Sequence, residues 1–277
     1  MTQTFTASTF GALPALPANT IGAQTFELDF STGVMPPGLS TSFWYGSGAS
    51  SREMGGDDLQ IYSDAAYNGV NPFSLTGGVL SIAAAPLTPA QSALAVNGGR
   101  KFSGGLLTTL GTFDQEYGFW EVGARCDPVA GLWPGIWLLG VPGSSSAGWP
   151  NASQEVDIWE AQGALPTEAF QSFHALQHNA AGTIAGSGPE NGNTCSVVNM
   201  GDWHDYGVLL TPTRMMFTVD RQVTYSAANP VAGNSMYALL DLAVGGWAPG
   251  NTAPAASTAG KMNISRLTAY ALAPGVA

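Results

Sequence analysis

Charged side chains are scarce in this 277-residue chain, at 10% of residues against about a quarter in a typical soluble protein. Bases are the scarcer sign: eight lysines and arginines stand against 19 acids, and only Lys101 and Lys261 are lysines. The formal net charge is −11 and no basic stripe exists, which argues against nucleic acid or an anionic membrane as a partner. A neutral polymer such as a polysaccharide fits better, although charge alone does not name one.

Cysteines and long hydrophobic runs are also lacking. Cys126 and Cys195 are the only cysteines, and they fit either one disulfide or two free buried thiols. No Cys or His lies at ligand spacing near either one, so we expect no metal site there. Polar residues, prolines and glycines interrupt uncharged stretches such as residues 65–99, so no segment is predicted to cross a membrane.

The first 24 residues carry no charge, no basic start and no continuous apolar run. We therefore predict an N-terminal arm or leader over residues 1–24, not a signal peptide. Residues 25–277 are predicted to form one domain, because this length is ordinary for a single all-β sandwich.

Glycine is abundant, at 36 residues, and hydrophobic residues reach 45%. Short apolar or alternating runs lie between Gly, Pro, Asn and Asp, and no long stretch has a helical period. This spacing predicts an all-β sandwich or barrel, with an α+β domain as the alternative. Residues 214–219 and 222–225, joined by Asp220 and Arg221, predict a β-hairpin. The other expected strands cover 79–83, 105–109, 118–126, 135–139, 155–160, 206–211, 237–244 and 264–270.

The most informative segment is Glu155-Val-Asp-Ile-Trp-Glu160, which places three acids within six residues. On a strand, Glu155 and Asp157 share one face, and Val156 and Ile158 point the other way. Strict alternation would put Trp159 on the acidic face, but one extra residue in a β-bulge would return Glu160 to it. The prediction is three carboxyl groups in a row.

Such a row suits retaining glycoside hydrolysis, in which one carboxylate attacks and a second carboxylic acid donates a proton. Nearby negative charge keeps the acid protonated by raising its pKa. A calcium-binding strand and a solvated acidic edge are the alternatives. Trp133 and Trp137 fit as sugar platforms or as core residues, and His174 could hydrogen-bond a sugar hydroxyl or a carboxylate.

The acidic segment resembles the E-x-D-x-x-E signature of glycoside hydrolase family 16, the laminarinase and lichenase family, in its bulged form. Residues 117–125 and 131–140 resemble the strand pair that precedes this signature. Residues 203–207, 217–220 and 242–246 follow in the order of the family. The resemblance covers residues 26–270.

The resemblance implies a β-jelly-roll sandwich of two curved antiparallel sheets, with the sugar bound in a concave groove. It implies that Glu155 is the nucleophile, Glu160 the general acid/base and Asp157 the assisting residue between them. The substrate-binding positions that it implies are Trp133, Trp137, His174 and Trp247.

Three positions depart from the pattern of the family. Asp241 stands where Asn is usual and Leu210 where Trp is usual, and departures of this kind bear on the choice of substrate. Ser265 stands where many members have an Asp that helps to bind calcium. We therefore expect that no cofactor is required, while a structural calcium ion stays open.

Together these residues predict a retaining endo-acting hydrolase of internal β-glycosidic bonds, with β-1,3-glucan or β-1,3/1,4-glucan as substrate. The alternatives are a depolymerase or transglycosylase acting on a bacterial exopolysaccharide, and a non-catalytic carbohydrate-binding protein. We expect an extracellular or periplasmic monomer that binds neither nucleic acid nor membrane.

Overall fold

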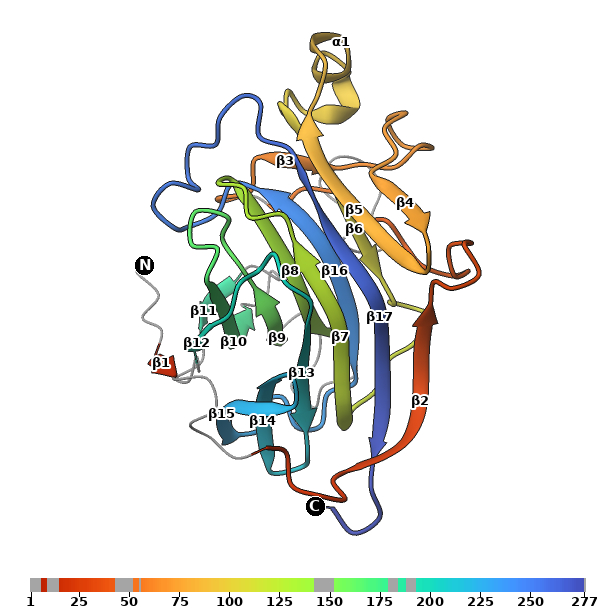
Figure 1. Cartoon of the computed structure of the whole chain (residues 1–277), viewed down its shortest axis with the longest axis vertical. Coiled ribbons are helices and arrows are strands. Elements are labelled where there is room, and N and C mark those ends of the chain that lie inside the picture. Colours follow the sequence, from red (N-terminus) through yellow and green to blue (C-terminus); the bar gives the residue numbers. More distant parts are fainter. Residues whose placement is uncertain are drawn as a thin grey trace.

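Two curved sheets packed face to face make up the protein (Figure 1). The computed structural model describes residues 6–8, 15–42, 52–54, 56–141, 152–178, 184–187 and 193–276. Pairings between the described strands are antiparallel, except that β3 runs parallel to β6 and β1 parallel to β12. The ladder passes from one layer to the other through β5, which pairs with β17 in one and β6 in the other.

Sheet A holds the acidic segment and runs in the order β6–β16–β8–β9–β10–β12–β1. β3 joins it beside β6, and β11 pairs with the end of β10. Its strands are β1 (Thr6–Ser8), β3 (Gln60–Tyr62), β6 (Phe102–Thr108), β8 (Leu132–Gly140), β9 (Ala152–Glu160), β10 (Glu168–His178), β11 (Ile184–Ser187), β12 (Asn193–Val197) and β16 (Met236–Val244).

Sheet B packs behind it in the order β15–β14–β13–β7–β17. β17 is long enough to pair with two further strands on its other side, β5 and β2, and β4 lies beside β5. The strands are β2 (Ile21–Asp29), β4 (Phe73–Thr76), β5 (Val79–Pro86), β7 (Gly118–Cys126), β13 (His204–Leu210), β14 (Arg214–Val219), β15 (Gln222–Ala228) and β17 (Gly260–Leu272).

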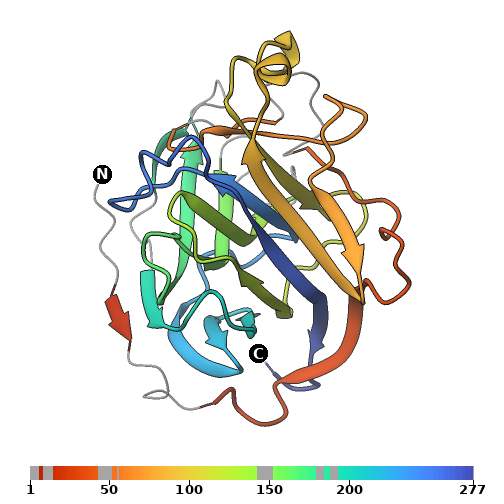
Figure 2. The ribbon, with the colours of Figure 1, turned by 45° about the horizontal axis from the view of Figure 1, so that its top comes forward.

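Among the described residues, helix is limited to two short turns between β5 and β6, at the top of Figures 1 and 2. These are α1 (Pro89–Ser92) and the 3₁₀ turn η2 (Ala95–Asn97). α1 begins with a capping box, in which Thr88 and Gln91 each accept a hydrogen bond from the backbone N–H of the other. Within the described residues, no helix is long and apolar enough to cross a membrane.

The expected strands are confirmed, with boundaries that shift by a few residues. The predicted hairpin is β14–β15, whose turn residues Asp220 and Arg221 both have positive φ, 51° and 60°. Two-residue turns of this form match the twist of the flanking strands. β2 begins at Ile21, so the last four residues of the predicted arm belong to sheet B.

The two cysteines are not bridged. Cys126 is a free thiol buried between the sheets, where burial raises its pKa well above the usual value. The side chain of Cys195 lies outside the described residues. Of the two alternatives open from the sequence, the disulfide is therefore absent.

The main core lies between the sheets and is built by alternation along the strands. On β16, Ala238, Leu240 and Leu242 point into this core, while Tyr237 and Leu239 point to the opposite face of sheet A. There they join a second buried cluster, and all nine residues of β16 are buried. We call this opposite face, which points away from sheet B, the site face.

The outer face of sheet B carries an ion-pair cluster around the buried Glu121. Arg221 donates to both of its carboxylate oxygens at 2.9 Å, and Arg266 lies 3.4 Å from one of them. Arg266 also pairs with Asp205 at 2.8 Å. The Glu121 side chain is only 1% exposed, so both arginines compensate a carboxylate that is removed from water.

We predict that Glu121→Gln lowers the free energy of unfolding by about 1.5–3 kcal/mol, because two charge-assisted contacts are lost at a buried site. Urea denaturation measures this change. Arg214→Gln is the matched control: the Arg214 side chain is exposed and donates to the hydroxyl of Ser226, so its loss should change little. An equal loss in both variants would contradict the cluster's role.

Candidate active site

A β-bulge in β9 sets the direction of the three acids. Ile136 of β8 pairs with Trp159, but its neighbour Trp137 pairs with Asp157, so Ile158 has no partner on β8. Ile158 and Trp159 are consequently both buried, at 1% and 0% exposure. The phase change predicted from the sequence is thus confirmed, and it returns Glu160 to the face of Asp157.

Side chains on the core side hold this bulge in place. Trp159 stacks on Tyr206 of β13, with ring centroids 4.4 Å apart, and so joins the two sheets. The fully buried Gln171 of β10 donates from Nε2 to the carbonyl of Ile158 at 2.8 Å and to that of Thr218 at 3.2 Å. Its Oε1 accepts from the hydroxyl of Thr224. The irregular backbone therefore keeps a hydrogen-bond partner.

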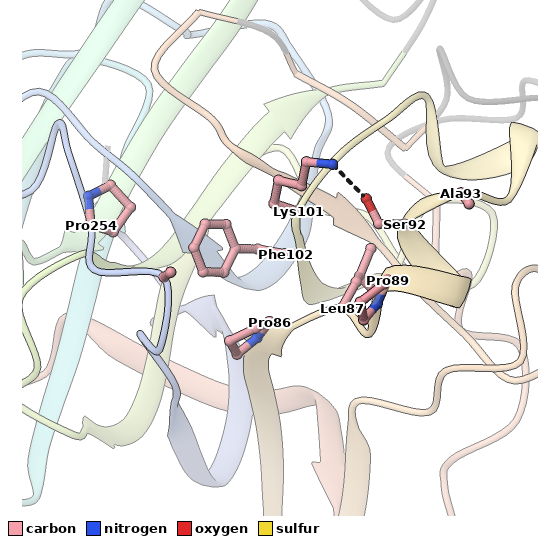
Figure 3. Close-up of a pocket in the computed structure, with 9 residues that line it drawn as sticks. Pro86, Leu87, Pro89, Ser92, Ala93, Lys101, Phe102 and Pro254 are labelled. Atoms are coloured by element: carbon pink, nitrogen blue, oxygen red, sulfur yellow. Dashed lines mark hydrogen bonds between the residues drawn. The ribbon is translucent and has the colours of Figure 1, made fainter.

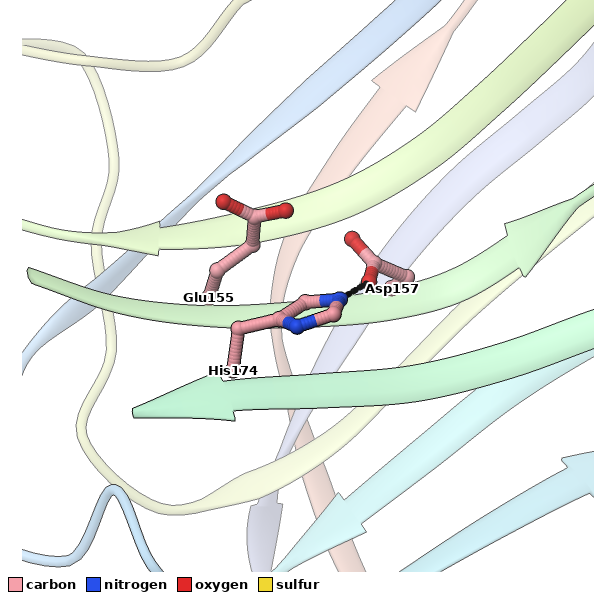
Figure 4. Close-up of side chains that lie close together, drawn as sticks. All are labelled: Glu155, Asp157 and His174. Carbon is pink, nitrogen blue, oxygen red and sulfur yellow. Dashed lines mark ion pairs between the residues drawn. The ribbon is translucent and has the colours of Figure 1, made fainter. Parts of the chain in front are cut away.

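On the site face, Glu155, Asp157 and His174 lie together (Figure 4). His174 is the cross-strand partner of Glu155 on β10, and its Nε2 is 3.1 Å from Asp157 Oδ2. Ser172, opposite Asp157, donates its hydroxyl to the same carboxylate at 2.5 Å. Asp157 is therefore anchored from β10, between the other two acids.

Glu160 is oriented from the other neighbouring strand. Trp133 of β8 donates its indole N–H to Glu160 Oε1 at 2.9 Å. Both side chains are half-buried, so the Trp133 ring keeps part of its surface at the site face. Trp247 packs edge-on against Phe170, the β10 partner of Glu160, with centroids 4.7 Å apart. Of the predicted substrate-binding residues, Trp133 thus contacts Glu160 directly, and Trp247 packs on the cross-strand partner of Glu160.

Of the two alternatives that the sequence leaves open for Trp137, a sugar platform or a core residue, its burial favours the core residue. Only 6% of it is exposed, and it belongs to the second buried cluster with Tyr62, Leu106 and Leu239. Its indole N–H donates to Asp241 Oδ1 at 2.8 Å. It therefore offers the solvent very little of its surface.

The electrostatics of the cluster favour protonated carboxyls. Burial and the charge of Asp157 raise the pKa of Glu155, and the same two causes raise that of Glu160 well above its usual value. Burial alone would lower the pKa of His174, but the hydrogen bond and charge of Asp157, with Glu155 and Glu160, outweigh it and raise this pKa to about 9. His174 is thus a cation at neutral pH, and its charge partly offsets the upward shift in both glutamates.

Apart from histidines, the charged residues on the strands of sheet A are all acids. These strands contain Glu155, Asp157, Glu160, Glu168 and Asp241 but no lysine or arginine. Sheet B, by contrast, carries Arg125, Arg214, Lys261 and Arg266 on its strands. The histidine beside Asp157 is therefore the cation closest to the acids among the described side chains of sheet A.

Glu155, Asp157 and His174 also have the composition of a metal site, with one ligand atom of each within 4.8 Å of the others. The imidazole Nε2 of His174 already lies 3.1 Å from Asp157 Oδ2, so these two groups are partners of one another. We therefore interpret the group as a hydrogen-bonded acid cluster. Ser265, the position that bears on calcium, donates its hydroxyl to the carbonyl of Gly123 at 3.1 Å.

A separate pocket of about 560 Å³ lies beside α1 (Figure 3). It is lined by Pro86, Leu87, Pro89, Phe102 and Pro254, and Lys101 at its rim donates to Ser92 at 3.1 Å. None of the predicted site residues lines it, and it contains no acid. Its chemistry is unrelated to that of the acidic strand.

Several residues of the site have no local sequence signal. Gln171 and Ser172 lie in a strand whose pattern says only that it is buried. Asp241 departs from the family pattern, but the sequence does not predict which residues contact it. Tyr62 donates its hydroxyl to Asp241 Oδ2 at 2.8 Å. It lies on β3, which pairs with β6, and β6 in turn pairs with β16, the strand of Asp241. Only tertiary pairing brings these groups together.

Solved structures with this architecture include β-glucanases. A non-specific endo-β-1,3(4)-glucanase, crystallised with a glucan oligosaccharide, matches with a TM-score of 0.73 at 24% identity, over 93% of this chain and 97% of that one. The laminarinase catalytic domain of Thermotoga maritima MSB8 matches with a TM-score of 0.68 at 20% identity, over 90% and 97%. The all-β jelly-roll prediction is thereby confirmed.

The chain belongs to glycosyl hydrolases family 16, whose model matches residues 80–266. Two endo-1,3-1,4-β-glycanases of Rhizobium meliloti strain 1021 are each 31% identical to it over 90% of its length. The chain spans about half the length, 52%, of these relatives. A glucan endo-1,3-β-glucosidase of Niallia circulans is 28% identical over 57% of the chain and 24% of its own length.

We predict that Gln171→Met destabilises the protein by about 1–3 kcal/mol, because the carbonyls of Ile158 and Thr218 lose their buried donor. Thr224→Val is the matched control, since it removes only the partner of Gln171 Oε1. Urea denaturation should show a clearly larger loss for Gln171→Met. Equal losses would mean that Gln171 does not support the bulge.

We predict that His174→Gln raises the pKa of Glu155 further, because the neighbouring positive charge is removed. Titration followed by ¹³C NMR of the labelled glutamate carboxyls measures this shift directly. His204→Gln is the control, since His204 pairs with Asp220 on sheet B, away from the site. An unchanged or lower Glu155 pKa in His174→Gln would contradict the electrostatic picture.

Proposed function

We propose that this protein is a retaining, endo-acting glycoside hydrolase that cleaves internal β-glycosidic bonds of a neutral polysaccharide. The observation that carries the proposal is the bulged strand, which presents Glu155, Asp157 and Glu160 to one face. Family membership supports the reaction class. The relatives are described as endo-1,3-1,4-β-glycanases and β-glucanases, so β-1,3-glucan or β-1,3/1,4-glucan is the proposed substrate.

In the proposed first step, ionised Glu155 attacks the anomeric carbon, and Glu160 gives its proton to the leaving oxygen. The raised pKa of Glu160 suits this step, because a general acid must still hold its proton at working pH. The positive charge of His174 favours the ionised form of Glu155. Asp157, held by His174 and Ser172, keeps the negative charge between the two glutamates.

In the second step, Glu160 removes a proton from water, which then attacks the anomeric carbon and releases Glu155. Once Glu155 is esterified its charge is gone, so one of the charges that raised the pKa of Glu160 is removed. The same residue can then act as a base. The Trp133 hydrogen bond supports that form, since it lowers the pKa of Glu160 and holds the carboxylate in place.

Two alternatives differ in how the reaction ends or whether it occurs. A transglycosylase would pass the sugar to another glycan, and a depolymerase would act on a bacterial exopolysaccharide in place of a β-glucan. A carbohydrate-binding protein would use the same face without chemistry. The presence of both glutamates, and of the Trp133 hydrogen bond that orients Glu160, favours hydrolysis over binding alone.

We predict that incubation with laminarin or mixed-linkage β-glucan releases oligosaccharides whose new reducing ends first appear as the β-anomer by ¹H NMR. Agarose and a bacterial exopolysaccharide complete the panel. Glu155→Gln and Glu160→Gln should each lower turnover by about 10³-fold or more, because each removes a group that reacts. Glu168→Gln, which changes an acid on the neighbouring strand β10, is the matched control and should retain activity.

The outcomes separate the alternatives. Products longer than the substrate would indicate transglycosylation, and release from the exopolysaccharide alone would replace the proposed substrate. Binding without any new reducing ends would overturn hydrolysis, as would near-normal turnover in either glutamine variant.

A further inference from the structure

Asp241 is a fourth carboxyl group on the site face, and the proposed reaction does not use it. It lies at the centre of β16 and is 3% exposed. Its Oδ1 accepts from the indole N–H of Trp137 and its Oδ2 from the hydroxyl of Tyr62, each at 2.8 Å. Both partners are neutral, so the carboxyl is buried without a cation, an arrangement that costs stability.

Gly135 of the neighbouring strand β8 leaves a gap in the layer of side chains, and this gap makes room for the arrangement. Asp241 pairs with Gly135 of β8, and Gly135 pairs with Glu160 of β9, so the three residues form one row across the sheet. A Cβ atom at Gly135 would lie 2.7 Å from Asp241 Oδ1 and 3.4 Å from Trp137 Cδ1. The carboxylate and the indole therefore occupy the space that a side chain would fill beside Glu160.

Trp137 connects this row to the next. Across β8 and β9 it pairs with Asp157, the acid between the two glutamates. With 6% of its surface exposed, Trp137 offers little area to a sugar, but it is the cross-strand neighbour of the middle acid of β9. Its orientation depends on where its N–H finds an acceptor, and Asp241 is that acceptor.

We propose that Asp241 is a positioning residue: with Tyr62 and the gap at Gly135, it fixes the Trp137 indole beside Asp157 and so aligns the acids of β9 with the bound sugar. This inference rests on the proposed hydrolase function. It also accounts for an acid at this position, because a carboxylate accepts from both donors at once, whereas an asparagine offers one accepting oxygen and must donate to the other partner.

Charge gives the arrangement a second effect. Burial raises the pKa of Asp241 to about 7, the bonds from Tyr62 and Trp137 oppose the shift, and the charges of Asp58 and Asp157 add to it. Ionised Asp241 in turn raises the pKa of Glu155. The titratable groups that face it are thus Tyr62, Asp58, Asp157 and Glu155, and the flanking strands β6 and β8 contribute none.

The test compares Asp241→Leu, which removes both acceptors, with Asp241→Asn, which keeps the shape. We predict that Asp241→Leu lowers kcat by about 10- to 100-fold, because misplaced reacting groups are costly. KM should change by less than about threefold, because Trp137 contributes little binding surface. Gly135→Ala should reproduce this kcat loss by displacing the carboxylate, and Tyr62→Phe should show part of it.

Asp241→Asn should recover most of the lost kcat, and the acidic limb of its kcat/KM profile should move to lower pH. The sign follows because removing the charge of Asp241 lowers the pKa of Glu155, which must be ionised to attack. Glu121→Gln on sheet B is the stability control: it lowers the melting temperature but should leave kcat, KM and the pH profile unchanged.

A folded Asp241→Leu variant with wild-type kcat and pH profile would overturn the proposal, as would an asparagine variant that recovers nothing and shifts no limb. A measurement independent of activity separates this failure from that of the hydrolase function. The indole ¹⁵N–¹H resonance of Trp137 should be displaced in Asp241→Leu and retained in Asp241→Asn, even if no glycan is cleaved. An unmoved resonance in Asp241→Leu would equally reject the role of Asp241.

Discussion

One unpaired residue, Ile158, determines what this sheet can do. Without it, alternation along β9 would turn Glu160 into the core and Trp159 outward. With it, Trp159 packs on Tyr206 between the sheets and Glu160 meets Trp133 on the site face. Gln171 satisfies the carbonyl that the bulge exposes. The reactive face and the core are therefore two results of the same backbone irregularity.

The site face is organised by hydrogen bonds from neutral donors more than by ion pairs. Ser172 donates a hydrogen bond to Asp157, and Trp133 donates one to Glu160. Tyr62 and Trp137 both donate to Asp241. Neutral donors orient a carboxylate without neutralising it, so raised pKa values persist where a general acid is needed. On sheet B, by contrast, Arg221 and Arg266 form ion pairs with the buried Glu121. The ion pairs around Glu121 and the acids of the site face thus lie on opposite sheets.

The parts of this structure that could be predicted from the sequence are those that depend on neighbours along the chain. The bulge at Ile158 is predicted from the clustering of three acids, against strict alternation. The hairpin turn at Asp220 and Arg221 and the shared face of Glu155 and Asp157 follow from local periodicity. The role of Trp137 does not, because its burial depends on a cluster assembled from β3, β6 and β16. The partners of Asp241 were hidden for the same reason: Tyr62 is 179 residues away in the chain. Spacing along a strand predicts which face of the sheet a side chain lies on. Whether that side chain is buried depends on other strands, which the spacing does not predict.

The absence of lysine and arginine from sheet A has a consequence for the solvent above it. Wherever more of these acids are ionised than the single charge of His174 offsets, this face has a negative potential, which attracts protons as well as larger cations. The local proton activity above the acids therefore exceeds that of the bulk solution. Dissolved salt reduces this excess within a Debye length of about 8 Å at physiological ionic strength. The ionic strength of the surroundings thus acts on the protonation of the whole row at once, and a neutral sugar chain is the kind of ligand whose approach it leaves unaffected.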